Sequence, residues 1–202
     1  MRWIAHLLAI LTTVTTPVLW RIVFMDKILY FFEDDRAGAC KGQIYYDFLD
    51  YAFQKADYFM LVYKNYYGKG YTEQQCYFLE RLNKFKVKSR TNPSWPGTLK
   101  TFCPDTTYQI VFYKTEPESK EILKEAECLS HWSRPNMPED LAFFIGERCW
   151  FYSVGHEEIA GIIHADEADV EFLEGKGLSS RENLIDHLDD YYLQYDEEGL
   201  RG

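Results

Sequence analysis

The sequence lacks the short motifs that define the commonest enzyme classes. A phosphate-binding P-loop is absent, because Gly68-Lys69-Gly70 has neither the upstream glycine spacing nor the Ser or Thr after the lysine that would hold phosphate and magnesium. The patterns G-x-G-x-x-G, H-E-x-x-H and G-x-S-x-G are absent as well. These absences argue against the motif-defined nucleotide-binding, zinc-protease and hydrolase classes, and the sequence predicts no cofactor.

Cysteine is scarce, and its spacing shows no pairing. The chain has five cysteines, an odd number, and none of them forms a C-x-x-C pair. A disulfide-stabilised secreted domain would be smaller and denser in cysteine, so we expect reduced thiols in a cytoplasmic protein. The cysteines are Cys40, Cys76, Cys103, Cys128 and Cys149.

No internal repeat with a period of roughly 20–50 residues is visible, which argues against solenoids and propellers.

Aromatic residues, by contrast, are abundant. They make up 17% of the chain and include 16 Tyr and 14 Phe. A disordered chain would be poor in them, so the sequence predicts a folded protein. Two interpretations of the tyrosines stay open. They line a core that is polar at its rim, which we favour, or they form a recognition surface, since Tyr is enriched in protein interfaces.

The net charge of −10 is unevenly distributed. Residues 156–202 contain 14 acidic and three basic side chains, whereas residues 1–155 contain 18 acidic and 19 basic ones. Residues 81–100 hold no acid and six basic residues, namely Arg81, Lys84, Lys86, Lys88, Arg90 and Lys100. We expect these two segments to attract one another within the fold. The overall charge would repel phosphate, which argues against nucleic-acid binding, and the acidic tail would suit a basic protein partner.

The first 24 residues are apolar and stand apart from the rest. Residues 3–20 carry no formal charge except on His6, and this run barely reaches the length of a membrane span. Pro17 and four threonines weaken that interpretation, and Pro17 also follows the best cleavage site of a signal peptide. Met25 begins a segment typical of a first strand, so we favour a start codon set too early over a membrane anchor or a cleaved signal. We therefore expect a cytoplasmic protein, with membrane contact only if residues 3–20 are a genuine anchor.

The order of apolar patterns predicts one α+β domain over residues 25–178, followed by an acidic helix and tail over residues 179–202. We expect a mixed or mainly antiparallel sheet with three to four helices. Strand-like runs lie at 28–32, 58–63, 85–89, 108–113, 141–145, 149–154 and 159–163, and helical spacing at 42–55, 72–82 and 118–132. Thr72 is a predicted N-cap with Gln75 at the capping-box position. Gly146 predicts a β-hairpin turn, and Ser179 or Ser180 would cap the acidic helix.

Candidates for catalysis and for metal binding are few. Cys149 and His156 bracket one strand-like run, where a thiolate and an imidazole oriented by Glu157 or Glu158 would form a nucleophile and base. Cysteine in a core strand behaves as a small apolar residue, and the ends of one strand lie too far apart to hydrogen-bond, so we predict no catalytic residue. Cys128 and His131 lie three apart on a predicted helix but supply only two ligands. We therefore predict no metal ion and a structural role for Cys128.

Two loops are more informative than any single side chain. One is Trp95-Pro96-Gly97-Thr98, and the other runs from Trp132 to Pro138-Glu139-Asp140-Leu141. They are followed by the pairs Cys149-Trp150 and His156-Glu157. Over about residues 57–165, this ordered set resembles a family of small uncharacterised proteins from Gram-positive bacteria, some of which carry the label stage III sporulation protein AH. The label would imply a membrane-anchored sporulation channel component, and we discount it because the chain does not look like a simple ring-forming module.

The resemblance implies no activity and transfers no catalytic residue. In physical terms, Gly97 would supply a special backbone angle, Pro138 would set a turn, and Glu139 or Asp140 would cap exposed backbone N–H groups. The residues that we assign to binding are Trp95, Pro96, Gly97, Glu139, Asp140, Trp150 and His156.

Three hypotheses for function follow. We favour a non-enzymatic protein-binding module, for example one that neutralises a toxin or acts on a phage or host factor. The alternative is a small enzyme or ligand-binding domain with a cleft near Trp95, Trp150, His156 and Glu157. The third hypothesis is a membrane-tethered accessory protein.

Overall fold

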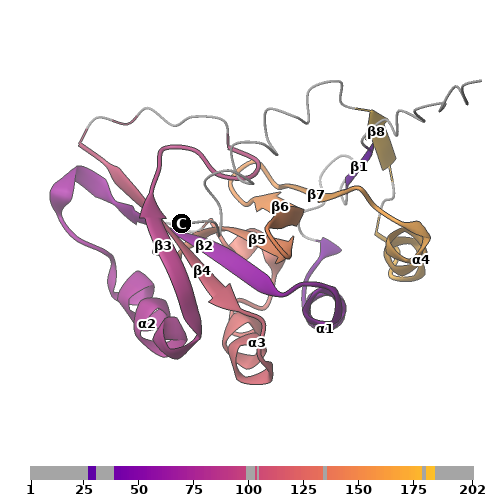
Figure 1. Ribbon diagram of the computed structural model, residues 1–202, viewed down its shortest axis with the longest axis horizontal. Helices are drawn as coiled ribbons and strands as arrows, with labels where there is room; N and C mark the ends of the chain where they lie inside the picture. Colours follow the sequence, from indigo (N-terminus) through magenta and orange to yellow (C-terminus); the bar gives the residue numbers. More distant parts are fainter. Residues whose placement is uncertain are drawn as a thin grey trace, which may run out of the picture.

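The computed structural model describes residues 27–30, 39–98, 103, 105–133, 136–178 and 181–184. Its centre is an eight-stranded sheet in the order β3-β4-β2-β5-β6-β7-β1-β8, and every strand pair in it is antiparallel (Figure 1). The strands are β1 (Lys27–Tyr30), β2 (Tyr58–Asn65), β3 (Lys86–Thr91), β4 (Thr107–Lys114), β5 (Glu139–Ile145), β6 (Arg148–Val154), β7 (Ile159–Ile163) and β8 (Arg181–Leu184). The α-helices are α1 (Gln43–Lys55), α2 (Glu73–Leu82), α3 (Pro117–Lys124) and α4 (Glu167–Gly175), joined by the short 3₁₀ turns η2 (Tyr66–Gly68), η3 (Asn83–Phe85) and η4 (Leu129–His131). The predicted single α+β domain with an antiparallel sheet is confirmed.

The helices lie on one side of the sheet (Figure 1). Apolar side chains are buried on both of its sides. On β2, Phe59 and Leu61 face the helices, whereas Met60 and Val62 belong to a second buried cluster on the other side. Successive side chains of a strand point to opposite faces, so a strand buried on both faces has a continuous apolar run. This explains why the central strands were visible in the sequence as unbroken apolar runs.

Local signals determine several helix ends. Thr72 accepts a hydrogen bond from the backbone N–H of Gln75, whose side chain in turn accepts one from the N–H of Thr72. This is the predicted capping box, which satisfies donors that the first turn leaves unpaired. The predicted β-hairpin is also confirmed, since β5 and β6 pair across a turn in which Gly146 has φ +56°.

The predicted helix over residues 118–132 is too long. α3 ends at Lys124, Glu127 adopts a left-handed φ of 61°, and Cys128 forms an isolated antiparallel bridge with Lys41. Ala126, Leu129 and Trp132 are nevertheless buried, so the apolar spacing was correct although the α-helix does not extend to these residues. Cys128 and His131 therefore do not share the face of an α-helix, and the geometry assumed for that ligand pair is absent.

The structure also differs after β7. α4 was not predicted, although Asp166 and Asp169 form a capping box at its start. In place of the predicted start of an acidic helix after Ser180, Arg181–Leu184 forms β8, which pairs with β1. The rest of the predicted helix and tail lies outside the described residues, as do residues 1–24. Within the part of the chain that the structure describes, no helix has the length and apolarity needed to cross a membrane.

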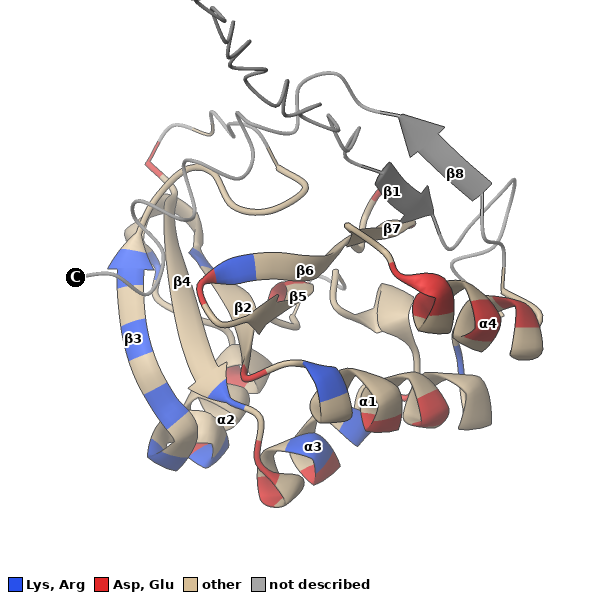
Figure 2. Ribbon diagram, turned by 45° about the vertical axis from the view of Figure 1, so that its right-hand side comes forward, with Lys and Arg blue, Asp and Glu red and all other residues tan. Residues whose placement is uncertain are grey.

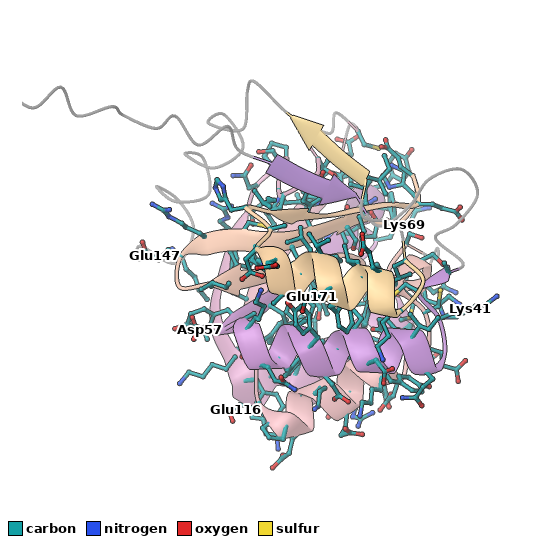
Figure 3. All side chains as sticks on the ribbon, turned by 90° about the vertical axis from the view of Figure 1, so that its right-hand side faces the viewer. Lys41, Asp57, Lys69, Glu116, Glu147 and Glu171 are labelled. Atoms are coloured by element: carbon teal, nitrogen blue, oxygen red, sulfur yellow. The ribbon has the colours of Figure 1, made fainter. Side chains whose placement is uncertain are left out.

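Charge divides the molecule into two ends (Figure 2). Basic side chains follow β3 at one edge of the sheet, whereas α4, with its exposed Glu167, Glu171 and Glu174, lies toward the other end. The described part of the acidic segment is thus separated from the basic one, contrary to the expected attraction within the fold. α4 instead packs beside α1, where Lys55 pairs with Asp166 (Figure 3).

Candidate functional site

The Asp140 carboxylate joins three loops that are far apart in the sequence. It accepts a hydrogen bond of 2.7 Å from the indole Nε1 of Trp95 and one of 2.9 Å from the backbone N–H of Gly155. The W-P-G-T turn, the start of β5 and the turn after β6 are therefore held together by one buried side chain. The prediction that an acidic residue of this segment caps a backbone N–H is confirmed for Asp140.

The local sequence explains this arrangement. Trp95 and Thr98 bond to each other through both backbone N–H groups, and Gly97 has φ +86°, as a Pro-Gly turn of this kind requires. A Cβ on Gly97 would lie 2.6 Å from a methyl carbon of Val154, so no side chain fits. Asp140 itself has φ 53°, a conformation that Asp tolerates better than most residues. The special backbone angle predicted for Gly97 is confirmed.

Gly155 completes the junction by close backbone approach. A Cβ at this position would collide with the carbonyl oxygen of Trp132 and lie 2.6 Å from the Cβ of Ser133. The same Trp132 carbonyl accepts a hydrogen bond of 2.9 Å from the backbone N–H of Asp140. The start of β5 and the turn at Gly155 therefore both contact the carbonyl group of Trp132.

Asp140 is an unusual carboxylate because it is fully buried. Burial raises its pKa to about 6, although the N–H groups of Gly155 and Trp95 stabilise the charged form; neighbouring Glu139 raises the pKa further, and Lys64 lowers it. A buried group whose charge is met by neutral donors, in a left-handed backbone, is typical of a functional site, although structural networks show the same features.

Glu139 is the next residue of the site, and its partner is a charged lysine instead of neutral N–H groups. Its carboxylate forms an ion pair with Lys64, which the antiparallel pairing of Val62 with Glu139 brings alongside. The ammonium also lies 5.9 Å from the ring centre of Tyr66 and 5.7 Å from that of Tyr108. Burial opposes the charge on Lys64, but attraction by Glu139 leaves its pKa raised. Lys64 is therefore charged over the ordinary pH range.

His156 stands at the solvent side of these two carboxylates. One ligand atom from each of Glu139, Asp140 and His156 lies within 4.8 Å of the other two. The imidazole is exposed, and its Nε2 lies 3.7 Å from a carboxylate oxygen of Glu157. We call Lys64, Glu139, Asp140 and His156 the rim cluster, since they meet where β2 ends, β5 begins and β6 ends.

An exposed turn adjoins the rim cluster through Tyr66. Tyr66 and Tyr67 are 39% and 61% exposed, and Tyr67 has a left-handed φ of 53°. The turn is closed by the N–H of Gly70, which donates to the side chain of Asn65 at 2.8 Å. We call residues 65–70 the tyrosine turn.

Trp150 is not part of this site. Its indole lies on the helix face of the sheet, where Nε1 donates to Asp169 at 3.4 Å and Lys55 lies 5.5 Å from the ring centre. Trp95 belongs to the cluster on the opposite face. The sheet separates the two tryptophans, so the hypothesised cleft lined by Trp95, Trp150, His156 and Glu157 does not form. Pro96 is buried in the turn beside Trp95.

Cys149 does not have the environment of a nucleophile. Its thiol is buried and donates to the carbonyl of Phe151 at 3.3 Å, and burial raises its pKa well above the ordinary value. Reactive cysteines have a lowered pKa and partial exposure. Cys149 lies near the start of β6 and His156 beyond its end, so the geometry favours the core interpretation over a catalytic pair.

Sequence reasoning missed Lys64 as the partner of Glu139, and Tyr66 and Tyr108 as the rings beside Lys64. The only available signal was a lysine directly after an apolar strand run, which is common at strand ends. No family model matches the chain, and a comparison with curated proteins and with solved structures finds no similar protein among them.

Proposed function

We propose that this chain is a non-enzymatic protein-binding domain whose contact surface is the tyrosine turn together with the exposed His156 and Glu157. The observation on which this rests is Tyr67, a non-glycine residue in a left-handed conformation whose ring is 61% exposed. Such a conformation is uncommon outside glycine, and here it projects an apolar ring into solvent. Folding alone gains little from that placement, whereas a partner would bury the ring.

The turn is held in place before any partner binds. The N–H of Gly70 bonds to the Asn65 side chain at 2.8 Å, and the N–H of Lys69 bonds to the Tyr66 carbonyl at 3.0 Å. Tyr66 is held in turn by Lys64, which is tied to buried Glu139. Tyrosine supplies a large contact area with few rotatable bonds, so a fixed turn loses little entropy on binding. Tyrosine is also frequent among the residues that dominate binding energy.

Negative charge at the α4 end of the molecule, away from the tyrosine turn, favours a partner with net positive charge. α4 presents Glu167, Glu171 and Glu174, which are exposed and lie at helical spacing on one face (Figure 2). Long-range attraction of this kind raises association rates and has a smaller effect on the lifetime of a complex. We therefore assign the anchoring contact to the tyrosine turn and the electrostatic steering to the acidic end.

The test compares two exposed tyrosines that lie on different elements. A photo-crosslinking amino acid is placed at Tyr67 or, as control, at Tyr77 of α2, which is 40% exposed and bonds to Glu125. In the cells that produce the protein, we expect position 67 to capture one defined protein that position 77 does not. Purified partner should then bind the Tyr66→Ser/Tyr67→Ser variant at least ~10-fold more weakly, the scale of one interface anchor, and the Tyr77→Ser variant unchanged. Equal capture at the two positions, or full affinity of the double variant, would contradict the proposal.

A further inference from the structure

The rim cluster has the composition of a metal-binding site. Three residues each offer one ligand atom within 4.8 Å of the others: the carboxylates of Glu139 and Asp140 and the imidazole of His156. Two atoms bound to one zinc ion at about 2.1 Å each lie at most roughly 4.2 Å apart. Both carboxylates are buried and His156 is exposed, so the imidazole is the ligand with room to adjust toward a bound ion.

The charges of the cluster are not balanced within it. Glu139 and Asp140 are both more than nine-tenths buried. Lys64 is paired with Glu139, while the two oxygens of Asp140 are met by the neutral N–H groups of Trp95 and Gly155. Two buried carboxylates and one ammonium leave one net negative charge, and buried charge is costly unless it is paired or bound to a metal.

The same hydrogen bonds would orient a metal ligand. Each Asp140 oxygen accepts a single N–H, at 2.7 Å from Trp95 and 2.9 Å from Gly155, so each keeps a second lone pair. Outer partners of this type fix the direction of a ligating carboxylate and raise metal affinity. Lys64 pairs with one oxygen of Glu139.

We infer that Glu139, Asp140 and His156 form a site for a divalent transition-metal ion such as zinc. An imidazole nitrogen with two carboxylate oxygens suits zinc, manganese or cobalt, whereas magnesium and calcium take oxygen ligands. Three protein ligands would leave a coordination position open for water or another ligand. This inference shares His156 with the protein-binding proposal, but its test is separate, since zinc binding is measured on the purified chain without a partner.

The experiment measures zinc binding to the full chain, produced without a histidine tag and dialysed against a chelator. Calorimetry should show one zinc ion per chain, and zinc should raise the melting temperature. His156→Ala should weaken binding at least ~10-fold and abolish the thermal shift, because one of three ligands is lost. Magnesium at the same concentration should give neither signal. His156 is exposed, so the variant is expected to fold.

Two matched variants control for other zinc ligands. His164→Ala removes another exposed histidine with a left-handed backbone, and Cys76→Ser removes the exposed thiol. Both should bind zinc as the unmodified chain does. Trp95→Phe should weaken binding by about 10-fold, because the Asp140 carboxylate loses one of the bonds that orient it. Absence of stoichiometric binding, full binding by His156→Ala, or loss of binding in Cys76→Ser would overturn the inference.

Discussion

Two buried aspartates in this fold have nearly the same partners and differ in how their charge is compensated. Asp140 and Asp169 each accept a hydrogen bond from an indole N–H, and a lysine lies close to each. At Asp169 the lysine bonds the carboxylate directly, with Lys55 Nζ at 2.6 Å, and the Tyr51 hydroxyl donates at 2.6 Å. At Asp140 the lysine is bound to neighbouring Glu139 instead.

The local structure around each aspartate explains why Asp169 is paired with a lysine and Asp140 is not. Asp169 lies in the capping box of α4, where it also accepts the N–H of Asp166 at 3.0 Å, and its partners come from the adjoining α1 and β6. Its donors thus satisfy it within a helix-packing junction (Figure 3). Asp140 has a left-handed backbone and lies beside an exposed histidine. A fully compensated carboxylate serves the fold, whereas an incompletely compensated one at the solvent boundary is a candidate for binding.

The largest effect is expected from removing each lysine in chelated protein. Lys55→Met leaves buried Asp169 without its cation and should lower the free energy of unfolding by about 3 kcal/mol, and Lys64→Met should cost a similar amount at Glu139. Urea denaturation with and without zinc separates the two regions. Zinc should restore part of the loss in Lys64→Met, because it supplies charge to the rim cluster, and none in Lys55→Met. If zinc changed the free energy of unfolding of the two variants equally, the surroundings of Asp140 and Asp169 would not differ in metal binding.

The next largest difference is expected between the backbone near Asp140, which is tightly packed at Gly155, and the end of α4, which is open at Gly175. Gly155→Ala places a methyl group on the Trp132 carbonyl and should destabilise the protein by about 3 kcal/mol, at the upper end for overpacking. Gly175→Ala at the end of α4 is the matched control, since its Cβ would meet nothing within 4 Å. Thermal unfolding of both variants measures the difference. A Gly155→Ala variant as stable as the control would show that the backbone around Trp132 and Gly155 can move apart at little cost in free energy.

The pH dependence of stability should differ at Asp140. Its folded pKa of about 6 lies above the ordinary 3.8, so the folded state binds the proton more tightly and the ionised group costs stability. That cost appears as pH rises from about 4 to 6, reaches roughly 2–3 kcal/mol, and is constant above. Asp140→Asn removes the titration.

The measurement is the free energy of unfolding of both proteins in chelator buffer from pH 4 to 7. The advantage of the unmodified chain over Asp140→Asn should shrink by that amount between pH 4 and 6. A constant difference across this range would show that the two N–H donors keep Asp140 ionised at little cost.

The smallest effects concern the two indoles. Trp95→Phe removes a 2.7 Å bond to a buried carboxylate and should cost about 2 kcal/mol, the usual value for a bond to a charged group. Trp150→Phe removes a 3.4 Å bond from a carboxylate that keeps other donors, and should cost less than about 1 kcal/mol. Denaturant unfolding of the pair tests the order. A larger loss in Trp150→Phe than in Trp95→Phe would mean that the bond from Trp150 to Asp169 stabilises the fold more than its length of 3.4 Å indicates.

Much of the fold was predictable because its signals are local. The capping box at Thr72 and Gln75 and the turn glycines Gly97 and Gly146 depend on neighbouring residues only, and the structure confirms them. Apolar burial also followed the sequence, even where the helix after Lys124 gave way to an extended bridge. α4 was missed because its capping acids were considered only in the net charge of residues 156–202, and no element was assigned there. The strand at Arg181–Leu184 exists through pairing with β1, a long-range contact that no local pattern indicates.

By itself, the sequence determined which residues form the central elements and which loops are exceptional. It singled out Trp95, Gly97, Asp140 and His156, because proline, glycine and acidic residues in those patterns restrict the backbone. Only the tertiary structure decided that Asp140 binds Trp95 and Gly155, that Lys64 pairs with Glu139, and that Trp150 lies on the opposite face. The physical reason is strand register. Pairing between distant strands determines which side chains meet, and alternation along one strand sends neighbouring residues to opposite faces of the sheet.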